Sequence, residues 1–396
     1  MLFQTDAAAS ASAAVLRAYA DEHLARYRRE LAHLVGIDSG SYSPDGVDAV
    51  GAWCAARLDA AGFAVESLPT PVVDGRRFGR VVVGRRRGTG TRRILLFAHM
   101  DTVFADGTAD LRPYRESGGR AFGPGVSDDK GGLLAGIHAA DVLDRAGYVG
   151  YGELILAFTP DEEVGAPASG GLLRAVGTGV DAALCLECAR ENGDVVIARK
   201  GVADVRFDVS GRAAHAGVEP ERGADAAVEA ARLLLDAHEL AREGEVTVNI
   251  GVVAAGDRPN VVPAAARLSG EVRAFGAGSL EQTLRALERR ANAPTVAGVV
   301  TAFRTEALCP PLEPTATATL FTAARDVAAE LGFSLGGAAT GGVSDANFVA
   351  ALGVPVLDGL GPIGGDDHSP AEWLDLASVP ERVALLAGLV VRIAEG

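Results

Sequence analysis

The stretch ILLFAHMD, residues 94–101, joins a run of large apolar side chains to a histidine and an aspartate. Five consecutive apolar residues predict a short strand that is buried on both faces. His99 stands where this strand gives way to a loop, which is a common location for ligands in open α/β sheets. Asp101 can accept the second ring N–H of His99 and so orient the imidazole. Taken alone, the pair is also typical of a hydrogen-bonded loop histidine.

Strand and helix patterns alternate on either side of this stretch. Apolar residues at helical spacing predict helices at 14–36, 47–61, 131–146 and 170–176. Apolar runs predict strands at 80–84, 94–98, 153–159 and 182–187. Buried strands that alternate with helices favour an α/β fold with a largely parallel, helix-covered sheet.

The pattern changes after Arg199. The following elements are predicted in the order strand, helix, strand, strand, helix, strand, at 202–210, 224–241, 246–253, 266–275, 279–291 and 296–305. This order is the ferredoxin-like pattern, and Ser279 is a natural N-cap for its second helix. We therefore expect an inserted α+β lid or dimerisation domain at 199–309, between two catalytic segments at 1–198 and 310–396.

Composition limits the class of protein. The chain has 396 residues and a formal net charge of −15, which argues against nucleic acid as a partner. No apolar stretch reaches the roughly 20 residues that span a bilayer, and residues 1–20 lack the basic start of a signal peptide. Four cysteines are too few for a disulfide scaffold in so long a chain. We expect a cytoplasmic protein without a membrane partner.

The segment GPGVSDDKGG, residues 123–132, places two aspartates between glycines and the start of a helix. Glycines let the backbone approach a site closely. Asp128 or Asp129 can bridge two metal ions about 3.5–4 Å apart. The alternative is that one of them caps the helix, next to its positive end.

Carboxylates also follow two other predicted strands. Glu162 and Glu163 come shortly after 153–159, where one of them can bind metal while its neighbour stays free as a general base. Glu187 ends another apolar strand, and a buried charge without a partner is costly there.

Two further histidines lie outside the predicted helices, and one of them completes the donor set. His368 lies in DDHSP, residues 366–370, after a glycine-rich turn. His215 lies within the predicted insertion, where it is better placed to stabilise charge on a substrate than to join a metal cluster. The remaining histidines fall in predicted helices and are assigned to packing: His23, His33, His138 and His238. Together, the acidic residues, His99 and His368 favour a two-metal hydrolase.

The motifs resemble, in order, those of the zinc-dependent peptidase family that contains aminoacylase, acetylornithine deacetylase and bacterial glutamate carboxypeptidase. The glutamate carboxypeptidase (carboxypeptidase G) branch is the most similar, chiefly through residues 123–132. The matching segments, which span roughly residues 30–390, are HMDTV at 99–103, GPGVSDDKGG at 123–132, DEE at 161–163, RAAHAG at 212–217, NVVP at 260–263 and HS at 368–369.

The resemblance implies a set of metal ligands. Asp128 would bridge two zinc ions per subunit, with His99 and Glu187 completing one site. Glu163 and His368 would complete the other site, and Co²⁺ or Mn²⁺ could replace zinc.

It also implies roles for residues that do not bind metal. Glu162 would be the general base, Asp101 would orient His99, and the peptide bond between Asp128 and Asp129 would be cis.

Substrate recognition is implied in the same way. Arg273 would bind the free α-carboxylate of the substrate, with Asn260 assisting. His215 would reach the scissile carbonyl oxygen in the partner subunit of a homodimer formed through the inserted domain, so that a monomer would be nearly inactive.

The expected function is a di-zinc, exo-acting hydrolase that cleaves the amide bond to an amino acid with a free carboxylate, as a glutamate carboxypeptidase does. Its substrate would be a small peptide or an acyl amino acid. One alternative is an N-acyl amino acid amidohydrolase, which uses the same chemistry. An alternative from another class is a non-catalytic carboxylate-binding protein that retains the fold.

Overall fold

A computed structural model describes residues 11–396 of the chain. The first ten residues, on which part of the signal-peptide expectation rests, lie outside the described residues. The chain divides into two compact units. One unit holds the residues up to 197, together with 314–339 and 344–396, and the other holds 198–313 and 340–343.

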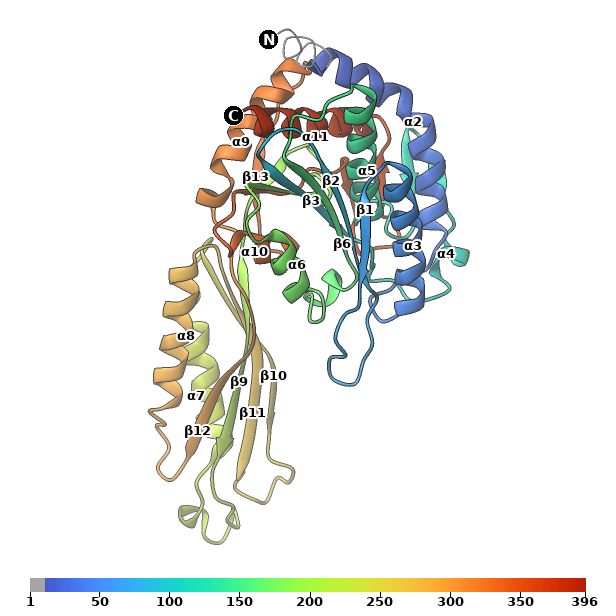
Figure 1. The fold of residues 1–396 in the computed structure, drawn as a ribbon. Coiled ribbons are helices and arrows are strands. Elements are labelled where there is room, and N and C mark those ends of the chain that lie inside the picture. Colours follow the sequence, from blue (N-terminus) through green and yellow to red (C-terminus); the bar gives the residue numbers. More distant parts are fainter. Residues whose placement is uncertain (1–10) are drawn as a thin grey trace. The chain divides into compact units, whose positions relative to one another are not determined.

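A six-stranded sheet forms the centre of the first unit (Figure 1). Its strands stand in the order β1 (Ala64–Leu68), β2 (Val81–Arg87), β6 (Glu153–Thr159), β3 (Arg93–His99), β7 (Ala182–Cys185) and β14 (Val356–Leu357). Strands β6, β3, β7 and β14 run parallel to one another. Strands β1 and β2 are antiparallel to their neighbours. The prediction of a largely parallel sheet is confirmed.

Helices cover both faces of this sheet (Figure 1). The helices of this unit are α2 (Ala13–Val35), α3 (Pro44–Ala60), α4 (Thr108–Leu111), α5 (Lys130–Arg145), α6 (Gly170–Gly177), α9 (Pro314–Glu330), α10 (Asp345–Ala350) and α11 (Ser378–Glu395). On one face α5 and α11 pack against β3, and α2 packs against both of these helices; on the other face α6 contacts β6 and α10 contacts β7. This double cover explains why β3 is buried from Ile94 to His99. Among the described helices, none has the length and apolarity to cross a membrane.

The parallel register brings the ends of three strands to one edge of the sheet. Strands β3 and β6 pair in step, so that His99 lies opposite Thr159. Strand β7 pairs with the other side of β3 and ends at Cys185, two residues before Glu187. The segments that follow these strands therefore meet at the carboxyl edge, where ligands bind in open α/β sheets.

A small sheet in the first unit joins two distant parts of the sequence. Its strands stand in the order β15 (Gly364–Gly365), β16 (Trp373–Asp375), β5 (Arg120–Phe122) and β4 (Arg115–Ser117). Because β16 pairs with β5, the loop before β16, which carries His368, is tied to the start of the loop that carries Asp128. Two further strands, β8 (Val195–Arg199) and β13 (Gly337–Thr340), form a two-stranded sheet.

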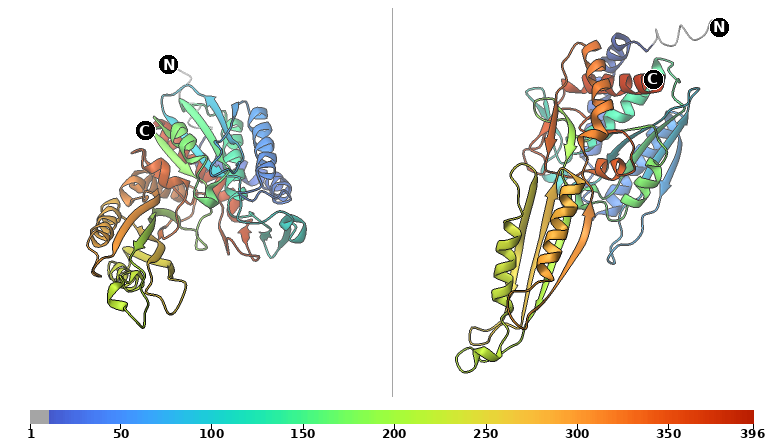
Figure 2. Two further views of the ribbon diagram at one scale, coloured as in Figure 1. Left: turned by 90° about the horizontal axis from the view of Figure 1, so that it is seen from below. Right: turned by 90° about the vertical axis from the view of Figure 1, so that its left-hand side faces the viewer.

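The second unit contains an antiparallel sheet with the strand order β10, β11, β9, β12. Its elements are β9 (Gly201–Ser210), α7 (Ala226–His238), β10 (Val246–Ala255), β11 (Ala265–Ala274), α8 (Ala277–Ala291) and β12 (Val300–Cys309). Helices α7 and α8 lie side by side on one face of the sheet (Figure 2). This chain order and strand order are ferredoxin-like, as predicted. The predicted cap was wrong: Ser279 lies inside α8, and Gly276 is the N-cap.

Candidate metal centre

Two groups of possible metal ligands share Asp128. His99, Asp128 and Glu187 form one group, and Asp128, Glu163 and His368 form the other. Within each group the donor atoms lie within 4.8 Å of one another. The sequence therefore located five side chains that the fold brings to one place.

The two oxygens of Asp128 face different groups. Its Oδ1 lies 2.9 Å from His99 Nε2, which is 3.6 Å from Glu187 Oε1. Its Oδ2 lies 3.1 Å from His368 Nε2, which is 3.0 Å from Glu163 Oε2. A carboxylate with one oxygen in each group has the arrangement that a bridging ligand requires.

The backbone around Asp128 has the unusual geometry that the resemblance implies. The peptide bond between Asp128 and Asp129 is cis, and α5 begins at the next residue, Lys130. The Lys130 side chain is buried and donates from Nζ to the carbonyl oxygen of Ile37 at 2.8 Å. The start of α5 is thus fixed to the protein interior two residues after the shared ligand.

Asp101 connects His99 to the segment that carries the two adjacent glutamates. It is fully buried, and His99 Nδ1 lies 3.0 Å from its backbone carbonyl oxygen and 3.3 Å from its Oδ1. Its oxygens also accept the backbone N–H groups of Glu162 and Glu163, at 3.1 and 3.2 Å, which begin the short helix η1 (Glu162–Val164). The Ser41 hydroxyl donates to its Oδ2 at 2.7 Å. Asp101 therefore orients the imidazole through its carbonyl and carboxylate oxygens, and its carboxylate positions both glutamates.

The electrostatics of the centre favour positive charge. Hydrogen bonds to Asp128 and Glu163 raise the pKa of His368 to about 11. Burial alone would lower the pKa of His99, but hydrogen bonds to Asp101 and Asp128 raise it well above its usual value. Burial, followed by the charge of Glu187, raises the pKa of Glu162 well above its usual value. These carboxylates compete for too few positive charges, and cations relieve that competition.

The donor set fits divalent metal ions. Imidazole and carboxylate are ligands that zinc commonly takes in proteins. Among the described residues, Glu163 Oε1 is buried without a hydrogen-bond partner, although its Oε2 contacts His368. An unpartnered buried oxygen is costly, and a metal ion would satisfy it.

Glu372 supports the shared ligand and was missed from the sequence. This buried side chain accepts three backbone N–H groups, from Gly125 at 3.0 Å, Ser127 at 2.9 Å and Asp128 at 3.1 Å. Burial raises its pKa to about 7. In the sequence, Glu372 is marked only by its position four residues after His368. No regular apolar pattern around it predicts a strand or helix that would bury it. Glu372 holds the loop in the conformation that presents Asp128.

Replacing Glu372 by glutamine should loosen that loop. The amide presents an N–H group to backbone donors, so we expect a loss of about 1–3 kcal/mol in the free energy of unfolding. Metal affinity should fall by roughly 10- to 100-fold, as for other groups that orient ligands. Thermal unfolding and equilibrium dialysis with Zn²⁺ measure the two effects. Glu330→Gln, which removes an exposed ion pair with Arg392, is the control and should change neither by much. Unchanged zinc affinity in Glu372→Gln would contradict the positioning role.

The other predicted site residues lie in the second unit. The 211–217 and 257–263 loops pair there: His215 and Val261 form a β-bridge, and the Ala216 N–H donates to the Asn260 carbonyl at 3.0 Å. His215 is exposed, and its Nδ1 accepts the Gly217 N–H at 3.1 Å. That bond places the ring proton of a neutral imidazole on Nε2, which is then a donor.

Arg273 already has partners in this structure. Its Nε and Nη2 donate to the two carboxylate oxygens of Glu271, at 2.8 and 2.9 Å. Its Nη1 donates to the Gly341 carbonyl at 3.0 Å. A planar anion could replace Glu271 on the same edge of the guanidinium, because the fork geometry suits any carboxylate.

Comparisons with known proteins show the family to which the sequence and the fold are similar. The sequence profile described as "Peptidase family M20/M25/M40" matches residues 95–392. Carboxypeptidase G2 from Pseudomonas sp. (strain RS-16) is 31% identical over 382 residues, covering 93% of this chain and 89% of that protein. Acetylornithine deacetylase from Myxococcus xanthus is 30% identical over 275 residues, covering 66% and 70% respectively. The crystal structure of aminopeptidase PepT from Bacillus cereus shares the fold, with a TM-score of 0.76 at 22% identity, covering 94% of this chain and 99% of that one.

Proposed function

Because the chain belongs to peptidase family M20/M25/M40, we propose that it is a di-zinc hydrolase of the carboxypeptidase type, which cleaves the amide bond to an amino acid with a free carboxylate. The observation that carries this proposal is the pair of donor groups around Asp128. His99 and Glu187 would hold one ion with Asp128. Glu163 and His368 would hold the other.

The reaction needs a proton acceptor beside the metal ligands. When bound, a pair of divalent cations lowers the pKa of water toward neutrality and polarises a carbonyl group. Glu162 would accept the proton of the attacking water and return it to the leaving amine. The Asp101 carboxylate accepts the backbone N–H of Glu162. This bond fixes the backbone of the proposed base and does not use its carboxylate, which can then accept a proton.

Recognition of the substrate would use the second unit. Arg273 would bind the α-carboxylate in place of Glu271, and Asn260 would assist. His215 Nε2–H would donate to the scissile carbonyl oxygen as charge develops there. These roles rest on the family resemblance, and the hydrogen bond from Gly217 to His215 Nδ1 supports the last of them.

A homodimer through the second unit is part of the proposal. Strand β10 is an edge of the sheet, and its exposed apolar residues include Val252 and Val253, which are 58% and 48% exposed. Open strand edges invite pairing with another chain unless they are protected. His215 would then act on the substrate of the partner subunit.

The second candidate is an N-acyl amino acid amidohydrolase. The similarity to acetylornithine deacetylase favours it, and the same residues would perform the same chemistry on an acyl group instead of a peptide. The two candidates differ only in the part of the substrate on the carbonyl side.

A substrate panel with added Zn²⁺, scored by released amine, tests both. The panel should hold peptidyl and N-acyl amino acids, including glutamates, each paired with its C-terminal carboxamide. We expect cleavage of the compounds that have a free C-terminal carboxylate. For the matching carboxamides kcat/KM should be roughly 10- to 100-fold lower, because the charge-assisted hydrogen bonds to the substrate carboxylate are lost. Equal cleavage of the carboxamides, or no cleavage of any compound, would overturn the proposal.

A further inference from the structure

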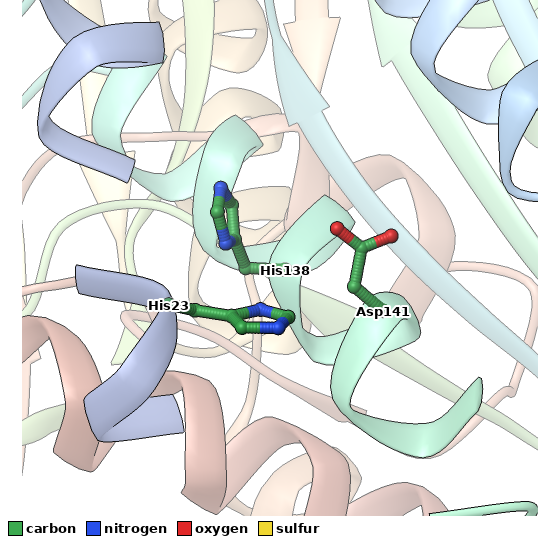
Figure 3. A group of neighbouring side chains, drawn as sticks. All are labelled: His23, His138 and Asp141. Carbon is green, nitrogen blue, oxygen red and sulfur yellow. The ribbon is translucent and has the colours of Figure 1, made fainter. Parts of the chain in front are cut away.

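A third group of possible metal ligands lies away from Asp128, where helix α2 packs against helix α5. His23 comes from α2, and His138 and Asp141 come from α5. Their donor atoms lie within 4.8 Å of one another. In Figure 3 a ring nitrogen of His23 faces a ring nitrogen of His138. We propose that these three side chains form an additional transition-metal site, suited to Zn²⁺, that joins the two helices.

Two buried nitrogens carry this proposal. His138 is fully buried, and the rings of His23 and His138 meet edge to face with centroids 5.5 Å apart. Among the described residues, Nδ1 of each ring is buried without a hydrogen-bond partner. A buried polar atom left in this state destabilises the folded protein. One cation bound by both nitrogens removes both deficits.

Glu30 fixes the tautomer that binding requires. The Nε2 of His138 lies 2.7 Å from Glu30 Oε2, so a neutral His138 carries its proton there and presents a lone pair at Nδ1. A carboxylate on the far nitrogen of a histidine is the usual support of a metal-binding imidazole. Burial, and then the charge of His138, lower the pKa of His23. A neutral His23 is therefore favoured, with a lone pair to offer.

Helix geometry supplies the third ligand. His138 and Asp141 are three residues apart on α5, a spacing that places both side chains on one face of a helix. Bundle proteins build metal sites in this way, with an i, i+3 pair on one helix and a further ligand on the helix that faces it. Imidazole nitrogens select zinc or copper over magnesium and calcium.

Two arginines next to the site affect its expected affinity for zinc. Arg26 and Arg57 each donate to Glu30 Oε1 and Asp141 Oδ2. The two positive charges of the arginines therefore offset the two negative charges of the carboxylates next to the proposed site. Both arginines bind the same oxygen of Asp141, and the ion would use Oδ1. Because the carboxylate charge is already neutralised, this site should bind zinc more weakly than the centre around Asp128 does.

Counting bound zinc in the full-length chain tests the site. The protein is stripped of metal with a chelator and dialysed against increasing Zn²⁺. His23→Gln should bind one ion fewer than the wild type. His33→Gln, which changes a histidine on the same helix that lies beside Trp53, should match the wild type. Equal stoichiometry for His23→Gln and the wild type would overturn the proposal.

A second pair of variants separates metal loss from damage to the helix. His23→Cys keeps a zinc ligand at this position, so it should restore the ion that His23→Gln lacks. Equal binding by the two variants would refute a ligand role for residue 23. The difference of one ion should persist in a His368→Gln background, so the result does not depend on the proposed catalytic centre.

Discussion

Glu162→Gln should reduce kcat by about 10²- to 10⁴-fold, the usual contribution of a general acid–base group, without loss of metal. Glutamine has nearly the same shape but cannot accept a proton. Glu162 is not among the five residues of the two groups that share Asp128. Its backbone N–H donates to the Asp101 carboxylate at 3.1 Å. The substitution would therefore remove the proposed base and leave the proposed metal ligands in place. Steady-state kinetics and zinc content, measured on the same preparation, show whether turnover is lost while zinc is retained.

The neighbouring glutamate provides the matched comparison. Glu163→Gln alters a side chain that lies 3.0 Å from His368 Nε2, so it should lower zinc content as well as turnover. If the two residues have the proposed roles, only the Glu163 variant will lose metal. Wild-type turnover by Glu162→Gln, or loss of zinc from it, would exclude Glu162 as the base.

The large strands and helices could be predicted because their sequences carry a period. The apolar run before His99 is buried on both faces of its sheet, and alternation along 202–210 matches β9. Burial is continuous along β3 and falls on alternate residues of β9, so each strand carries a regular apolar pattern in its sequence. His99, the two adjacent glutamates and Glu187 then became candidates from their positions after those strands. Asp128 and His368 lie in glycine-rich segments, and the complete ligand set was implied only by the family resemblance.

The supports of the site could not be predicted in this way. Strands β15 and β16 have two and three residues, which is too short for any period to emerge. They nevertheless tie the His368 loop to the segment before Asp128, and Glu372 reaches Asp128 from the same part of the chain. Such contacts between distant residues depend on the completed fold, and a single sequence carries no mark of them.

Side-chain partners are a further limit. Arg273 could be identified as a candidate carboxylate ligand, but its pairing with Glu271, two residues away on the same strand, became visible only in the structure. His23 and His138 fall in helices and were assigned to packing. Their positions gave no reason to bring them together, because the contact depends on how α2 packs against α5.

Asp128→Asn should have a broader effect than any other ligand substitution, because it acts on both donor groups at once. The asparagine amide has only one oxygen, so it cannot provide an oxygen ligand both to the group with His99 and to the group with His368. Loss of a group that merely orients a ligand lowers metal affinity by about 10- to 100-fold, and loss of the shared ligand should exceed that at both sites. We expect kcat to fall by roughly 10²-fold or more, with both ions lost at a zinc concentration that saturates the wild type.

Variants that change only one of the two donor groups show whether Asp128 is shared, and are called one-sided variants. Glu187→Gln should weaken only the ion bound with His99, and His368→Gln only the ion bound with Glu163, so each should retain one of the two ions. Asp366→Asn changes an exposed carboxylate in the His368 loop and controls for altered surface charge. If Asp128→Asn lost a single ion, as the one-sided variants do, the two groups would not share this ligand, and two independent metal sites would replace the bridged pair.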